Sequence, residues 1–141
     1  MEHVVPQPKI DIPEENAEVM ELEEIVPEYY SRFAVVRWLF HKRLQLALAY
    51  VGKIRPRSLL DVGCGDGAFV RFLASDPELG AIDISALDIN PRILKLKSEF
   101  PRYTFTVGSV LKTDFPEGAF DAVVALDMLE HLIEARSAAT E

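Results

Sequence analysis

The feature that most constrains the fold is a glycine-rich turn that directly follows an apolar run. Residues 58–62 predict a buried strand, the glycines Gly63, Gly65 and Gly67 follow it, and residues 68–74 predict a helix. Because glycine has no side chain, the backbone N–H groups of such a turn and of the helix start can approach a ligand closely. The pattern therefore predicts a ligand site where this strand ends.

The rest of the chain alternates between apolar strands and helices with short links. Such an alternation predicts an α/β fold, a parallel sheet with helices on its faces. The expected elements are a long apolar helix from about residue 29 to 52, strands at 58–62, 82–89, 103–107 and 120–126, and helices at 68–74, 91–100 and 128–136.

Composition narrows the class of protein. A chain of 141 residues with 49% hydrophobic and 27% charged residues is large enough for one globular domain. It contains no apolar run of about 18 residues, and Met1 precedes an acid, so we expect neither a membrane span nor a secretory leader. The single cysteine, Cys64, excludes an internal disulfide, and the default location is a reducing cytoplasm.

The net charge of −8 is concentrated at the N-terminus. Residues 1–24 hold eight acids and one lysine, whereas residues 25–141 hold 15 acids and 14 bases. We therefore expect a mobile acidic arm over residues 1–24 and one domain over residues 25–141. The arm is interpreted as a solvated tail, or alternatively as a docking segment or a charged mask over a basic surface.

Two carboxylates indicate what kind of ligand the turn would hold. The glycines are spaced G-x-G-x-G, which differs from the G-x-G-x-x-G of dinucleotide sites. Asp61 precedes the first glycine, where it would repel a pyrophosphate and attract an ammonium group. Asp88 lies 21 residues after Gly67 at the end of the next strand, where an acid can accept both hydroxyls of a ribose. S-adenosylmethionine combines a ribose with a positive group and has no pyrophosphate.

With these motifs the sequence resembles the class I S-adenosylmethionine-dependent methyltransferases, over about residues 50–132. Their first motif resembles residues 61–67, their second 87–89, their fourth strand 120–126, and a following stretch 128–132. The resemblance implies a Rossmann-like fold whose full sheet has seven strands in the order 3-2-1-4-5-7-6, of which this chain would supply strands 1–4.

The resemblance also implies the cofactor-binding residues. The methionine end would lie against the turn, with Asp61 acting on the amino group and Cys64 filling the turn as a small residue. Many family members have an acid where this chain has Ser109, so a hydroxyl or the Val110 N–H would have to serve the adenine. No catalytic residue is implied, because positioning supplies most of the catalysis of methyl transfer. The implied contacts are Asp61, Gly63, Cys64, Gly65 and Gly67 for the methionine end, Asp88 for the ribose, Ile89, Ser109 and Val110 for the adenine, and Leu126 and Asp127 beside the sulfonium.

The string that contains Asp127, Glu130 and His131 has two interpretations. Asp127 as N-cap and Glu130 at the third helical position would form a capping box. Alternatively the three side chains share a helix face and could bind a divalent metal. Small-RNA 2′-O-methyltransferases resemble this string with Glu-x-x-Glu-His and a further histidine, which this chain lacks. We favour the cap and predict no metal site.

The acceptor is not fixed by the residues. We expect a small molecule or a lipid; the near-neutral charge of residues 25–141 disfavours nucleic acid without excluding it. The alternatives are a non-catalytic, methyltransferase-like binding or regulatory fragment and a metal-assisted RNA 2′-O-methyltransferase. The chain stops fifteen residues after Leu126, so the fourth strand would form an open edge. We expect self-association or a split partner through that strand.

Overall fold

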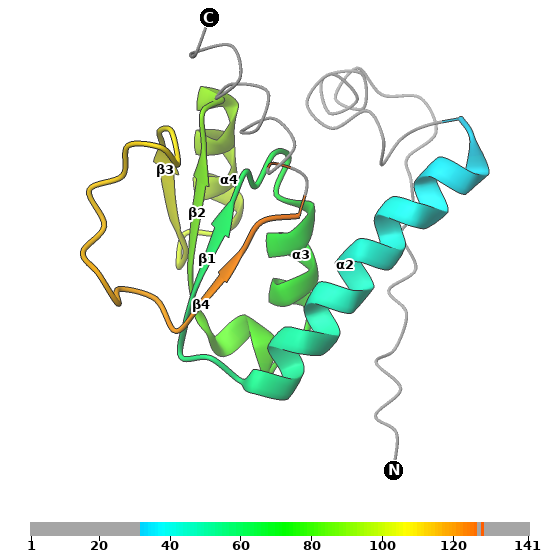
Figure 1. Ribbon diagram of the computed structural model, residues 1–141, viewed down its shortest axis with the longest axis horizontal. Helices are drawn as coiled ribbons and strands as arrows, with labels where there is room; N and C mark the ends of the chain where they lie inside the picture. The colour runs from blue at the N-terminus through cyan, green and yellow to red at the C-terminus, as the bar shows by residue number, and fades with distance from the viewer. Residues whose placement is uncertain (1–31, 127, 129–141) are drawn as a thin grey trace, which may run out of the picture.

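Four parallel strands form one sheet in the order β3-β2-β1-β4 (Figure 1). The computed structural model describes residues 32–126 and residue 128 of the chain. The α/β class and the strand order both match the expectation from the sequence. The elements are α2 (Ala34–Ile54), β1 (Ser58–Val62), α3 (Ala68–Ser75), η1 (Leu79–Ala81), β2 (Asp83–Asp88), η2 (Pro91–Lys95), α4 (Leu96–Glu99), β3 (Thr104–Val107) and β4 (Ala122–Val124).

Helix α2 runs past the position where the sequence predicted its end. Gly52 lies inside the helix, which continues to Ile54. Arg55 then adopts a left-handed conformation with φ 47°, and its N–H donates to the carbonyl of Val51 at 2.8 Å. Because Pro56 follows, the helix cannot continue. The proline, rather than the glycine, therefore determines where α2 ends.

Two further elements differ from their expected form. The helix expected over residues 91–100 starts as the 3₁₀ turn η2 and becomes α-helical only in α4. The N–H of Ile93 donates to the carbonyl of Asn90 three residues earlier, and the Asn90 side chain accepts from the N–H of Arg92, so the start is tight. Strand β4 has three residues instead of the expected seven, because only those residues pair with β1.

The helices pack on one face of the sheet. In Figure 1, α3 lies between the strands and α2, and α2 runs along its outer side. Side chains of β1, β2 and β3 meet the helices in a continuous apolar cluster. Its fifteen buried residues are Leu44, Leu48, Val51, Leu59, Cys64, Phe69, Val70, Leu73, Ile82, Ile84, Ala86, Ile93, Leu96, Tyr103 and Phe105.

A loop covers the opposite face of the sheet. Leu60, Val62 and Leu87 are buried there. Within the described residues, their cover comes from the segment 108–121 and from residues after β4, with no helix among them. The partly buried side chains that pack on this face are Val110, Phe115, Phe120, Ala125 and Met128. The chain passes from β3 to β4 without a helix, so the helices expected on the faces of the sheet cover only one of them here.

Asp121 fastens the start of β4 to the start of β1. Its Oδ2 accepts the N–H of Arg57 at 2.8 Å and that of Ser58 at 3.4 Å, while its own N–H donates to the Ser58 hydroxyl at 3.0 Å. These backbone hydrogen bonds, first of all that of Arg57, lower the pKa of the Asp121 carboxyl below its ordinary value. The clamp sets the register in which Leu59 pairs with Ala122.

None of the helices that the structure describes is long and apolar enough to cross a membrane. The acidic arm over residues 1–24 and the helix expected over 128–136 fall outside the described residues, apart from Met128.

Candidate functional site

The glycine-rich turn lies at the carboxyl ends of β1 and β2. The N–H of Gly63 donates to the carbonyl of Leu87 at 2.7 Å, which ties the turn to the end of β2. Gly63 and Gly67 have φ values of 71° and 78°, in the left-handed region that disfavours other residues. A Cβ on Gly63 would lie 2.9 Å from the Met128 Cβ, and one on Gly67 would lie 2.6 Å from the Leu96 Cδ1. The positive φ values and the close neighbours Met128 and Leu96 therefore both disfavour any residue other than glycine at these two positions.

Asp61 is a buried carboxylate at this edge, with 3% of its surface exposed. It lies on β1 between Ala86 of β2 and Val124 of β4. Asp61 interacts with other groups of the protein. Its Oδ2 atom, however, is buried and accepts no hydrogen bond from the described residues. A buried carboxylate favours a positive partner, because burial alone disfavours its charge. Its position suits the ammonium group that the sequence predicted for it.

Asp88 is the best-defined carboxylate of the site. Its Oδ2 accepts the N–H of Gly65 at 2.9 Å, and its Oδ1 accepts the N–H of Asn90 at 2.8 Å. The side chain therefore links the end of β2 to the glycine-rich turn and cannot rotate without losing both bonds. A carboxylate offers about four acceptor positions, so each oxygen keeps one for a further donor such as a hydroxyl.

Cys64 lies buried in the turn among carboxylates. Burial, followed by the charges of Asp61 and Asp88, raises the pKa of the Cys64 thiol far above its usual range. The thiol therefore stays protonated and has no nucleophilic character at neutral pH. The neighbouring Asp66 accepts the N–H of Ala68 at 3.0 Å and so satisfies a donor at the start of α3. Both residues shape the turn.

The residues expected around an adenine ring lie at the same edge but differ in orientation. Ile89 follows β2 and is 74% exposed. The N–H of Gly108 donates to the carbonyl of Asp88 at 2.8 Å, which brings the end of β3 beside Asp88. Ser109 is exposed, and its hydroxyl accepts the N–H of Leu111 at 3.3 Å. The Val110 side chain turns away and packs on the loop-covered face.

After β4 the chain returns to the turn. Leu126 is partly buried against the helix-side cluster, and Met128 packs beside the turn, over Gly63. Asp127 lies outside the described residues, as do Glu130 and His131, so the capping box and the metal interpretation stay predictions. Among the residues that the structure describes, no group of three His, Cys, Asp or Glu side chains could hold a metal ion.

Sequence reasoning missed two side chains that line the turn. Leu96 packs against Gly67, and Met128 packs against Gly63. Met128 belongs to a stretch that the family motif covers, but a motif match gives no contact. The glycines were the only signal in the sequence for these two contacts, because a position that requires glycine can have another side chain packed close to it.

Together these groups fit a ligand that carries a ribose and a positive charge. Three carboxylates, those of Asp61, Asp66 and Asp88, act on the one thiol at Cys64, which shows how negative the turn is. That charge would oppose a pyrophosphate and favours a cation. The residues present thus fit S-adenosylmethionine.

Comparison with known proteins agrees with this geometry. A family model described as "Methyltransferase domain" matches residues 60–141. Among curated proteins, the ubiquinone biosynthesis O-methyltransferase of Alkalilimnicola ehrlichii is 35% identical over 100 residues, covering 68% of this chain and 40% of that protein. The ajmaline N-methyltransferase of Rauvolfia serpentina is 32% identical over 85 residues, covering 55% and 28%.

A third relative has a different acceptor in its name. The small RNA 2′-O-methyltransferase of Mus musculus is 29% identical over 122 residues, covering 77% of this chain and 30% of that protein. The crystal structure of the methyltransferase domain of a bacterial protein, CtHen1-CN, shares the fold with a TM-score of 0.57 at 21% identity, covering 69% of this chain and 55% of that one. The chain spans less than half the length of each of the three curated relatives. Both the family model and the fold lead to one conclusion: the chain belongs to the methyltransferase-domain family, among the class I S-adenosylmethionine-dependent methyltransferases.

Proposed function

We propose that this chain binds S-adenosylmethionine at the carboxyl edge of its sheet and takes part in methyl transfer from it. The observation that carries the proposal is the Asp88 carboxylate, held by the N–H groups of Gly65 and Asn90. The buried Asp61 lies at the end of the adjacent strand. The two acids would serve the two ends of one ligand, the ribose and the amino group.

Each predicted site residue has a role in this proposal. Asp61 and the turn of Gly63, Cys64, Gly65 and Gly67 would hold the methionine end. Asp88 would accept the ribose hydroxyls, and the exposed Ile89 would pack on the adenine together with Ser109 and the backbone of Val110. Leu126 and Asp127 would border the sulfonium, with Met128 beside the turn. S-adenosylmethionine, when bound, supplies a methyl group that is already activated on a positive sulfur.

The chain's own contribution is to bind and orient. A fixed ribose and a fixed amino group determine where the methyl group lies, and such positioning supplies most of the rate of a group transfer. We propose a small molecule or a lipid as acceptor, and a reducing, cytoplasmic setting. The names of the ajmaline and ubiquinone relatives support the first part, and the presence of a single cysteine, Cys64, supports the second.

The test is calorimetry with S-adenosylmethionine and S-adenosylhomocysteine. We expect one site per chain. Asp88→Ala should weaken binding by about 1–3 kcal/mol, roughly 5- to 150-fold, because two ribose hydroxyls lose a charged acceptor. Asp83→Ala is the matched control, since this acid lies exposed at the opposite end of the same strand. Because Asp88 also holds the glycine-rich turn, circular dichroism must show that each variant is folded. Asp88→Asn removes the charge with less disturbance of the turn than Asp88→Ala. Equal affinity in all three variants would remove Asp88 from the site.

A second candidate acceptor is RNA. The small RNA 2′-O-methyltransferase supports it, because its match covers 77% of this chain, more than the other two relatives cover. Methylation of a small RNA duplex that requires manganese or magnesium, and that Glu130→Gln abolishes, would favour this candidate. Ligand binding without transfer to any acceptor would favour a non-catalytic binding subunit.

A further inference from the structure

Helix α2 is apolar on two sides, and only one of them meets the core. Leu44, Leu48 and Val51 pack inward. Val35 and Tyr50, 75% and 66% exposed, lie on the other side. The spacing of this second set places it on one stripe of the helix. We call it the outer α2 face; its apolar members are Val35, Trp38, Leu39, Leu46 and Tyr50, all of them exposed.

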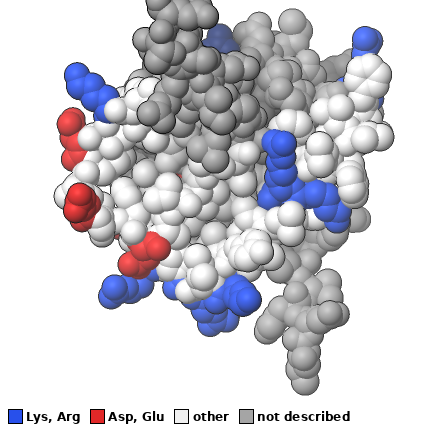
Figure 2. Space-filling view, viewed as in Figure 1, with Lys and Arg blue, Asp and Glu red and all other residues white. Residues whose placement is uncertain are grey.

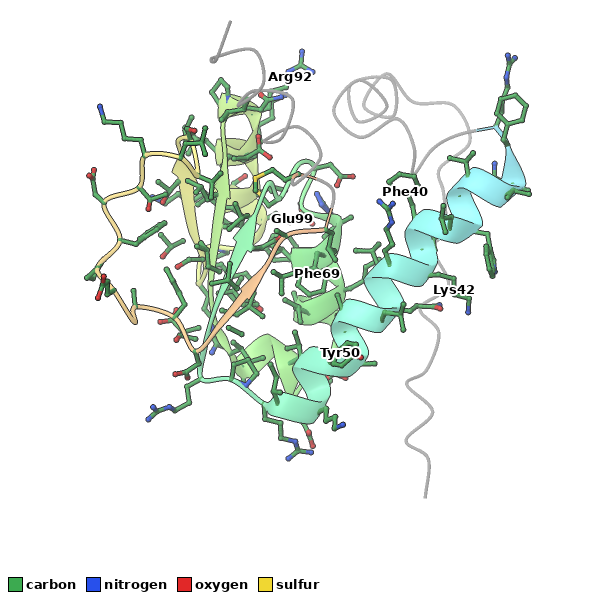
Figure 3. The ribbon with its side chains drawn as sticks, viewed as in Figure 1. Phe40, Lys42, Tyr50, Phe69, Arg92 and Glu99 are labelled. Carbon is green, nitrogen blue, oxygen red and sulfur yellow. The ribbon has the colours of Figure 1, made fainter. Side chains whose placement is uncertain are left out.

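The outer α2 face is also basic. Helix α2 contains four Lys and Arg and no acid: Arg37, Lys42, Arg43 and Lys53. Helical spacing places Lys42 and Lys53 on the same stripe as Val35, Leu46 and Tyr50. Figure 3 shows Lys42 pointing away from α3, and its ammonium lies 6.0 Å from the centre of the Trp38 ring. In Figure 2, the right side of the surface, where α2 runs, shows blue side chains and no red ones, whereas the red ones lie at the left beside further blue ones. A surface that combines exposed apolar side chains with basic ones is complementary to a partner that is both acidic and apolar.

Residues 1–31 have that composition. They hold nine acids and one lysine, a net charge of −8 against +4 in helix α2. Apolar residues are interspersed among these acids. The segment also joins α2 directly, so its local concentration at the helix is in the millimolar range typical of short tethers. The acids are Glu2, Asp11, Glu14, Glu15, Glu18, Glu21, Glu23, Glu24 and Glu28, and the apolar residues nearest to α2 are Val19, Met20, Leu22, Ile25 and Val26.

We propose that the acidic segment of residues 11–31 docks on the outer α2 face of its own chain. Acids of the segment meet Lys42 and Lys53, and its apolar residues cover Trp38 and Tyr50. A second copy of α2 is a worse occupant, because it brings the four positive charges of one helix against the four of the other. An anionic membrane is a worse occupant too, because the tethered acids compete for the same bases and repel the lipid headgroups.

The chain provides its own probe for this contact. Trp38 is its single tryptophan and lies on the outer α2 face. Acrylamide quenching of its fluorescence in the full chain therefore measures cover of that face alone, and acrylamide carries no charge. We expect Trp38 to be shielded from acrylamide, although 60% of its surface is exposed to solvent in the structure. The shielding should not change with protein concentration.

Charge-neutral variants assign the shielding to the segment. Glu18→Gln, Glu21→Gln and Glu24→Gln together should raise the quenching constant about twofold or more, because the attraction to the bases of α2 weakens. Asp83→Asn, Asp114→Asn and Glu117→Gln together form the matched control: they remove the same charge from exposed acids of the described residues and should change nothing. Equal quenching in the two triple variants would overturn the proposal.

Zero-length cross-linking with a carbodiimide supplies the second, direct measurement. It joins a carboxylate to a lysine amine only where the two touch. We expect links from Glu18, Glu21 or Glu24 to Lys42 or Lys53, and mixing isotopically light and heavy chains should show that both ends belong to one chain. Links between chains, or shielding that appears only at high protein concentration, would overturn the proposal in favour of a second copy of the chain. Shielding that requires phosphatidylglycerol vesicles would overturn it in favour of an anionic membrane.

Discussion

The two faces of the sheet are built differently, although the same strands form both. Fifteen buried residues join the sheet to α2, α3, η2 and α4 on one face, whereas three buried residues lie under a loop on the other. The helix-covered face therefore supplies most of the described apolar burial. The glycine-rich turn spans both faces, since Leu96 lies against Gly67 on one and Met128 against Gly63 on the other. The difference suggests a firm support for the turn on the helix side and an adjustable one on the loop side.

The largest expected effect comes from emptying the helix-covered face. Leu73 of α3 is fully buried, so Leu73→Ala leaves a cavity among side chains of the sheet and the helices. We expect a loss of about 2–5 kcal/mol in the free energy of unfolding. Urea denaturation followed by circular dichroism measures it. A loss below about 1 kcal/mol would show that this face does not dominate stability.

A smaller effect is expected from the loop-covered face. Phe115 is only partly buried and packs edge-on against Phe120 with ring centres 5.1 Å apart. Phe115→Ala should cost about 1–2 kcal/mol, less than a fully buried phenylalanine, because the ring already meets water. Leu111→Ala is the control in the same loop: this leucine is 63% exposed, and its loss should stay within about 0.5 kcal/mol. If Phe115→Ala matched Leu73→Ala, the two faces would contribute equally.

The smallest effect concerns the link between β1 and β4. The folded state lowers the pKa of Asp121, so the carboxylate stabilises the fold at pH values above its unfolded pKa. That contribution is lost as the pH falls below the ordinary value of 3.8 and through the lowered folded value. Asp121→Asn should therefore show a shallower loss of melting temperature between about pH 5 and pH 2 than the parent. Parallel slopes in thermal melts would rule out a contribution of the Asp121 charge.

The sequence predicted the strands that form the frame of the site. Apolar runs such as residues 58–62 predicted the strands and the place of Asp61 and Asp88, and the family resemblance implied the order β3-β2-β1-β4. The two acids lie close together because the carboxyl ends of parallel strands share one edge. The partner through β4 stays a prediction; among the described strands β4 pairs with β1 alone, and Val123 is 61% exposed.

Tertiary contacts account for most of what the sequence did not predict. The end of α2 is the exception: Gly52 favours a helix end on local propensity, yet the helix continues to Ile54 and ends before Pro56. The length of β4 depends on how many residues find a partner in β1. Likewise, the packing of Met128 over Gly63 joins residues 65 positions apart, which no local pattern encodes.

The buried thiol of the turn has a consequence for how the protein ages. Oxidants and alkylating agents attack the thiolate, and the raised pKa of Cys64 leaves almost none of it at neutral pH. The structure therefore places its one sulfhydryl at the carboxyl edge of the sheet in a form that peroxide converts slowly to a sulfenic acid. Handling in air should leave the turn chemically intact.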